Sequence, residues 1–151
     1  MIGGKMARYF TLAEAEALLP IVTGLLRQAV ALKARYIKTT QELQAAAERV
    51  AFSGGAVVDV NQVLQWRARR EAASARLNEI AEEVQSHGCL IKDLDVGLLD
   101  FPTLYRDREV YLCYRLDEPG IRFWHGVDEG YRGRKPIDQE FLEHHGGDAN
   151  H

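Results

Sequence analysis

The stretch TLAEAEALLPIVTGLLRQAVALKARYIKTTQELQAAAERVAF, residues 11–52, decides the fold. Apolar or small side chains recur in it every seven residues, which indicates one face of a long, coiled-coil-like helix. Its seam includes the leucines at positions 18, 25 and 32. Thr11 and Glu14 have the spacing at which two side chains cap a helix start reciprocally. We therefore predict helix over 11–52, kinked or divided at Pro20, where the backbone lacks an N–H.

A second helix is expected after the break at Ser53-Gly54-Gly55. Asp59 or Asn61 can cap its start, and His87-Gly88 supplies the cation and the glycine that commonly end a helix. Helices over 11–52 and 60–87 joined by a short loop form an antiparallel hairpin. The second helix is shorter, so the Leu-rich N-terminal part of the first must pack on the C-terminal half of the chain.

That C-terminal half alternates apolar and polar residues in short runs, which is typical of strands. Two pairs of runs flank turn sequences: 89–94 with 98–101, and 109–116 with 121–125. The two hairpins predict a small antiparallel β-meander of about four strands over 89–126, packed on the N-terminal part of the first helix. The predicted fold class is α+β, with a single domain over 8–137 and a flexible tail over 138–151.

Composition restricts the function classes. The chain has 151 residues and a formal net charge of −3, which fits one globular domain and argues against a dedicated nucleic-acid-binding protein. It has no apolar run close to the ~18 residues that span a bilayer. Only Cys89 and Cys113 are present, too few for a disulfide framework, so reduced thiols and a cytoplasmic location are expected.

Catalytic and metal-binding candidates gather at the β end of this fold. His125 ends the last predicted strand, and an even-length loop before that strand would put it on the apolar face of Leu112, with Trp124 on the other face. Asp100 and Glu118 are carboxylates that could approach His125, to orient a general base or to hold a divalent metal ion. The simpler interpretation of His125 is a structural histidine.

The ligand-binding candidates are Lys92, Asp93, Trp124 and Arg134. A three-residue loop would place Lys92 opposite Asp100, where a cross-strand ion pair is the simpler interpretation. Arg134 follows a Gly-bracketed loop and could grip a phosphate or carboxylate, whereas a solvated arginine is the simpler interpretation.

A thiol ligand is also conceivable. Cys89, Cys113 and His125 could ligate a metal together, but the sequence has no C-x-x-C pair, and a buried inert thiol is the simpler interpretation of Cys113.

Four motifs together resemble a small bacterial family of uncharacterised proteins, a domain of unknown function. They read YFTLAEAEALLP, KDLDVGLLDFP, VYLCYRLDE and FWHGVDEGYRGR, and the resemblance extends from about residue 8 to about residue 136. The chain departs from the family pattern at Tyr114 and Asp117. The resemblance implies recurring polar positions, Lys92, Asp93 and Asp100 among them, but no activity.

Two functional interpretations remain open. The hairpin seam is rich in alanine and is interrupted by Thr39 and Arg70, so a second hairpin could dock on it to form a homodimer. The second interpretation is a metal-dependent hydrolase or a protein that binds a small anionic ligand, with Asp, Glu, His and Arg side chains at the sheet. We expect a homodimeric hairpin with a polar site at its β end.

Overall fold

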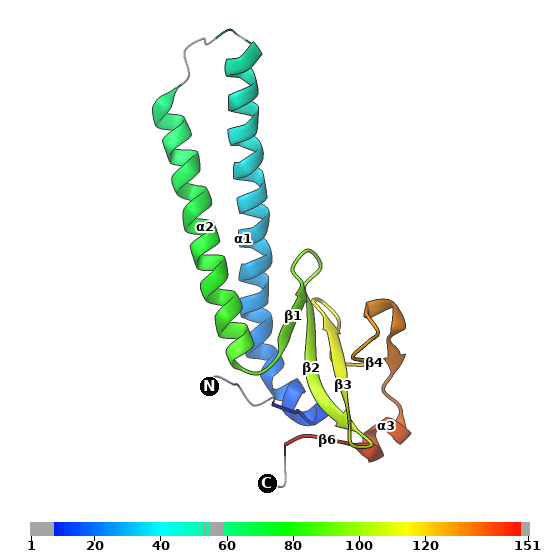
Figure 1. The fold of residues 1–151 in the computed structure, drawn as a ribbon. Helices are drawn as coiled ribbons and strands as arrows, with labels where there is room; N and C mark the ends of the chain where they lie inside the picture. The colour runs from blue at the N-terminus through cyan, green and yellow to red at the C-terminus, as the bar shows by residue number, and fades with distance from the viewer. Residues whose placement is uncertain (1–7, 53, 55–58, 149–151) are drawn as a thin grey trace.

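The computed structural model describes residues 8–52, 54 and 59–148. Its longest part is the hairpin of α1 (Leu12–Phe52) and α2 (Val60–Ser86), which extends well beyond the sheet (Figure 1). The Thr11 hydroxyl accepts from the Glu14 N–H at 3.1 Å, and the Glu14 carboxylate accepts from the Thr11 N–H at 2.9 Å, which is the predicted capping box. α1 continues past Pro20 as one helix. Ser53 and Gly55 of the predicted break lie outside the described residues.

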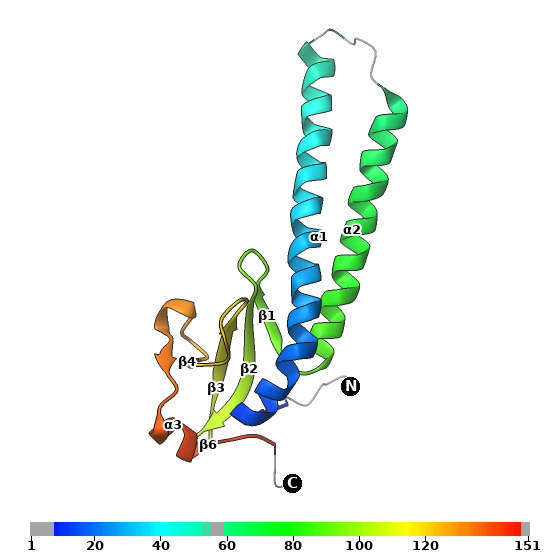
Figure 2. The ribbon, with the colours of Figure 1, turned by 180° about the vertical axis from the view of Figure 1, so that it is seen from behind.

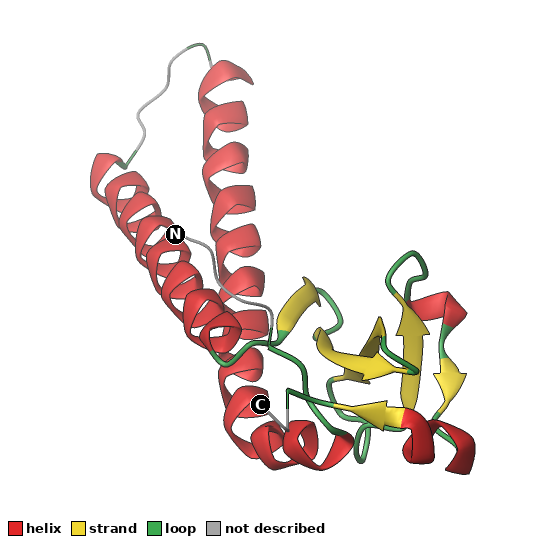
Figure 3. Cartoon of the chain, turned by 60° about the horizontal axis from the view of Figure 1, so that its bottom comes forward, coloured by secondary structure: helices red, strands yellow, loops and turns green. Residues whose placement is uncertain are grey.

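The sheet has six strands, where the sequence predicted about four. Its antiparallel path runs through β1 (Leu90–Asp93), β2 (Leu98–Tyr105), β3 (Arg108–Arg115), β4 (Phe123–Gly126) and β5 (Lys135–Pro136), and β6 (His145–Gly146) pairs with β2. β5 and β6 have two residues each, too few to show an alternation pattern. The hairpin followed by an antiparallel sheet confirms the predicted α+β fold (Figures 2 and 3).

The N-terminal part of α1 supplies the core between hairpin and sheet. Val22 and Leu26 are fully buried and belong to the same apolar cluster as Phe101 of β2 and Leu112 of β3. By length and composition alone α1 could also cross a membrane, but core helices of soluble proteins share that property. Only 22% of the apolar window of α1 is buried in the structure, so this cluster accounts for part of its apolar character.

The core face of β3 is the predicted one, with Val110 and Leu112 in the apolar cluster, but the two faces of β4 are the reverse of those predicted. Leu112 is paired with Trp124, and Tyr111 with His125. Trp124 therefore shares the core face with Leu112, while His125 lies on the opposite face, which also carries Cys113. The prediction assumed an even-length loop, but the connection between paired Cys113 and paired Phe123 spans residues 114–122, an odd number that inverts the alternation.

The predicted flexible tail over 138–151 is wrong for residues 138–148, and residues 149–151 lie outside the described part. The Asp138 carboxylate accepts from the Phe141 N–H at 2.9 Å and caps the short helix α3 (Gln139–His144). Phe141 is 1% exposed, and its ring centroid lies 4.9 Å from those of both Tyr105 and Trp124. One aromatic anchor thus holds a segment whose polar composition suggested disorder.

The same C-terminal segment closes onto the start of α1. Nε2 of His145 accepts from the Leu12 N–H at 3.0 Å, and the Asp148 N–H donates to the Tyr9 carbonyl at 3.0 Å. A Cβ added at Gly147 would lie 2.9 Å from the Tyr9 carbonyl oxygen, so the close approach requires glycine there. The segment therefore satisfies one backbone donor at the N-terminus of α1, the Leu12 N–H, which the helix itself leaves unpaired.

Candidate metal centre

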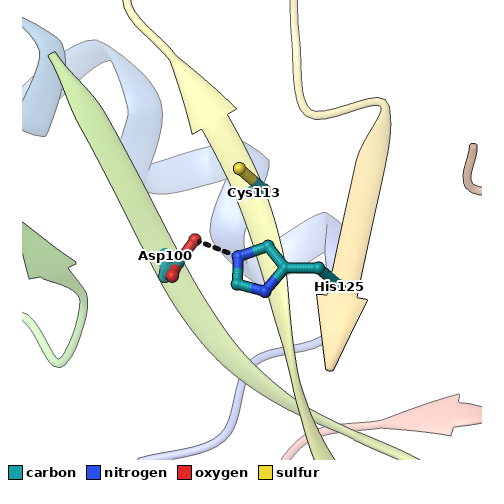
Figure 4. Close-up of side chains that lie close together, drawn as sticks. All are labelled: Asp100, Cys113 and His125. Atoms are coloured by element: carbon teal, nitrogen blue, oxygen red, sulfur yellow. Dashed lines mark hydrogen bonds and ion pairs between the residues drawn. The ribbon is translucent and has the colours of Figure 1, made fainter. Parts of the chain in front are cut away.

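Three adjacent strands bring Asp100, Cys113 and His125 together on the sheet face opposite the core. Asp100 of β2 is paired with Cys113 of β3, and His125 of β4 is paired with Tyr111, two residues from Cys113 on the same face. Figure 4 shows the three side chains converging from the three strands. Their potential ligand atoms, a carboxylate oxygen, a thiol sulfur and an imidazole nitrogen, all lie within 4.8 Å of one another.

The three side chains are almost completely buried. Asp100 is 1% exposed, Cys113 0% and His125 3%. Nε2 of His125 lies 3.0 Å from Oδ1 of Asp100, and both cysteines of the chain are free thiols. Polar and ionisable groups are costly to bury without partners, so their placement here needs a compensating interaction, either with one another or with a bound ion.

Both ring nitrogens of His125 face acceptors. Nδ1 lies 2.8 Å from the carbonyl oxygen of Gly126, to which it must donate, and Nε2 faces Asp100. Burial lowers the pKa of His125, but the hydrogen bonds with Asp100, Cys113 and Gly126, together with the charge of Asp100, outweigh it and raise the pKa to about 10. In the metal-free protein, the partners of His125 therefore favour the protonated form of its ring.

This charge gives the stability of the metal-free protein a pH dependence. The folded-state pKa of His125 lies above the value of about 6.5 expected for an unfolded chain, so folding retains a proton. The stabilisation should be complete below pH about 6.5 and should disappear as pH rises through about 10. Urea unfolding between these pH values, with chelator present, should show the wild type losing its advantage over His125→Gln; a constant difference would contradict this assignment.

Lys92 lies beside the pair, but not in the register predicted for it. Leu90 is paired with Asp100, and the register shifts between Ile91 and Asp93, so Lys92 occupies an irregular position in β1. Its flexible side chain still places Nζ 3.9 Å from Oδ2 of Asp100 and 4.7 Å from the ring centroid of Tyr111.

Glu118 and Arg134 form a separate ion pair next to Cys113. Their nearest charged atoms are 3.1 Å apart, and the Arg134 guanidinium stacks on Phe123 and Tyr131, 4.1 and 4.0 Å from the ring centroids. Burial lowers the pKa of Arg134, but Glu118 and nearby Cys113 outweigh it and raise the pKa further. The charge of Glu118 is thus paired with Arg134. The residue that joins Asp100 and His125 in the cluster is Cys113.

Two other candidates lie away from the cluster. Asp93 accepts from the Asp95 N–H at 2.8 Å within the turn after β1. Trp124 packs on the core face, with Lys135 4.8 Å from its ring centroid. From the sequence, an inert thiol was the simpler interpretation of Cys113. An odd-length connection between β3 and β4 would have indicated Cys113 as a site residue, because it places Cys113 and His125 on one face.

A family model described as "Uncharacterized conserved protein (DUF2203)" matches residues 8–137. The chain belongs to the DUF2203 family. Comparison of this DUF2203 chain with curated proteins and with solved structures gave no match. Asp100, Cys113 and His125 all lie inside the matched region, whereas Phe141, which fills part of the core, lies beyond its end.

Proposed function

We propose that the protein binds one zinc-type divalent metal ion between Asp100, Cys113 and His125. The observation that carries this proposal is the convergence of carboxylate, thiol and imidazole within 4.8 Å on three adjacent strands. These are the ligand types that zinc takes in proteins. The Gly126 carbonyl holds Nδ1–H of His125, the outer hydrogen bond that commonly orients a metal-bound imidazole and leaves Nε2 to face the metal.

The nearly complete burial of the three side chains favours an ion that ties the strands together over one that turns over a substrate. A hydrolytic metal needs an open position that a substrate can reach, and these residues are 0–3% exposed. Binding must release the proton held between His125 and Asp100 and the proton of the Cys113 thiol. Metal affinity should therefore rise with pH.

Metal analysis of tag-free, full-length protein tests this proposal. After dialysis against equimolar zinc, we expect about one ion per chain, and with cobalt the near-ultraviolet absorption of a cobalt–thiolate bond. Cys113→Ser should abolish that absorption and lower zinc content. Cys89→Ser is the matched control, because Cys89 is equally buried but its thiol donates to the Val84 carbonyl. No zinc uptake by the wild type, or equal loss in both variants, would refute the proposal.

We also propose that the hairpin pairs with the hairpin of a second copy. A groove of about 400 Å3 runs between α1 and α2. It is lined by five apolar side chains, including Leu43, Ala46 and Ala47, and by Arg67 and Arg70. Several large apolar side chains of the hairpin are also exposed: Tyr36, Ile37, Phe52, Val60 and Leu64. Packing against a second hairpin would remove this surface from water, as in a four-helix arrangement.

Light scattering coupled to size-exclusion chromatography tests the pairing. The wild type should have twice the 17.0 kDa mass of one chain. Ala47→Lys would add a third positive charge to a groove that already contains Arg67 and Arg70, and it should give monomers. Ala34→Lys, at an exposed position of α1 outside the groove lining, should remain dimeric. A monomeric wild type or a dimeric Ala47→Lys protein would contradict the pairing.

A further inference from the structure

A second, cationic groove lies in the middle of the hairpin. It measures about 630 Å3, within the range of small-molecule sites, and it is separate from the groove assigned to pairing. Its floor includes Thr39, which is 4% exposed, and Ala73, which is 3% exposed. The small side chain of Ala73 leaves space between the two helices at this level.

Four cations line this groove and only one carboxylate does. Arg35 and Lys38 come from α1, Arg69 and Arg76 come from α2, and the carboxylate is Glu42. This excess contrasts with the net charge of −3 of the whole chain. The groove therefore has a local excess of positive charge in a chain whose net charge is negative.

Three of these cations are not neutralised by neighbouring acids. Among the described residues, Arg76 bridges Glu79 at 3.0 Å, while Arg35, Lys38 and Arg69 have no carboxylate within 4.0 Å. Elsewhere in the molecule, arginines such as Arg106 and Arg134 have acidic partners. Unpaired guanidinium groups on both walls of a groove are suited to bidentate contacts with phosphate oxygens.

We propose that this groove binds a small ligand that carries a diphosphate group. Arg35 and Arg69 would hold the phosphates from the two helices, with Lys38 adding a third positive charge. Glu42 would repel a purely anionic ligand but accepts hydrogen bonds from hydroxyl groups, so a hydroxyl-bearing organic diphosphate fits better than an inorganic one.

The surroundings favour a small ligand over a nucleic acid. α2 carries Glu71 within its groove-lining segment, residues 69–76, and Glu79, Glu82 and Glu83 beyond the C-terminal end of that segment. A long polyanion would meet these charges, whereas a ligand confined to about 630 Å3 would not. We expect binding to be weakened by salt, since the cations are exposed.

Isothermal titration calorimetry of full-length protein with ADP tests the proposal, and inorganic pyrophosphate distinguishes an organic from an inorganic diphosphate. ADP should bind, and Arg35→Gln/Arg69→Gln should weaken it by about tenfold or more, the effect of losing two charge-assisted contacts. The control Arg49→Gln/Arg108→Gln also removes two exposed cations, but neither lines the groove. It should change affinity by about twofold at most, because only long-range charge is altered.

Every outcome decides the matter. Retained ADP binding in the control with a loss in the groove variant supports the proposal, and weaker binding of pyrophosphate than of ADP supports the role of Glu42. Tighter binding of pyrophosphate overturns the organic part of the proposal. If the wild type does not bind ADP at about 5 mM, the proposal is overturned. An equal loss of ADP affinity in the groove variant and in the control variant overturns it as well. Displacement of ADP by a single-stranded 20-nucleotide DNA at far lower concentration would assign the groove to nucleic acid instead.

Discussion

Asp100→Ala is expected to destabilise the metal-free protein by about 3–5 kcal/mol, the cost of breaking a buried ion pair by removing one partner. The substitution leaves His125, 3% exposed, without the carboxylate that lies 3.0 Å from its Nε2. The ring must then lose its proton or remain charged without a counter-ion, and either costs free energy. Urea unfolding in the presence of chelator measures the loss.

Two variants make this expectation specific. Asp128→Ala removes an exposed carboxylate from the loop after β4 and should change the free energy of unfolding by less than about 0.5 kcal/mol. Asp100→Asn keeps an oxygen that can accept from His125 but loses the charge, so its stability should lie between those of the wild type and Asp100→Ala. A loss of under about 1 kcal/mol in Asp100→Ala would show that the pair contributes no more than an exposed ion pair.

Phe141→Ala is the other substitution with a large expected effect, about 3–5 kcal/mol, because truncating a fully buried aromatic side chain leaves a cavity. Phe141 lies between Tyr105 and His145, with ring centroid distances of 4.9 and 5.3 Å. Its loss should release α3 and β6 together, and with them the His145 contact to the start of α1. Thermal unfolding followed by circular dichroism measures the decrease in stability.

Val127→Ala is the control for this substitution, because Val127 is 47% exposed in the turn after β4 and lies outside the surface assigned to pairing. It should alter stability by less than about 0.5 kcal/mol. Truncation after Ile137, at the end of the family match, should be at least as destabilising as Phe141→Ala. Full stability of the truncated chain would contradict the role assigned to residues 138–148.

The hairpin was predictable because its signals are local. Thr11 and Glu14 set the helix start, Asp59 sets the next one, and the seven-residue repeat spans the whole first helix. The C-terminal segment was not predictable, because Phe141 is a single aromatic residue among polar ones and its partners lie about twenty to forty residues earlier. Contacts between aromatic residues that are far apart in the chain produce no repeating pattern in the sequence.

The candidate site was half predictable. Asp100 and His125 were paired as candidates from their chemistry, and the structure brings them to 3.0 Å. Cys113, and not Glu118, is the third residue of the cluster. The odd length of the connection 114–122 places His125 on the same face as Cys113, and Glu118 forms an ion pair with Arg134. Alternation divides the residues of a strand into two sets but does not say which set shares a face with the neighbouring strand. A change of one residue in the length of the connecting loop exchanges the two sets.

The aromatic stack around Trp124 gives the protein an internal optical reporter. The chain has two tryptophans: Trp66 on α2, and Trp124, whose ring contacts both Tyr105 and Phe141. Indole emission shifts to longer wavelength when the ring meets water, so the fluorescence of a Trp66→Phe protein would follow only the sheet and its C-terminal segment. Detachment of that segment would then be visible in real time, separately from any melting of the helices.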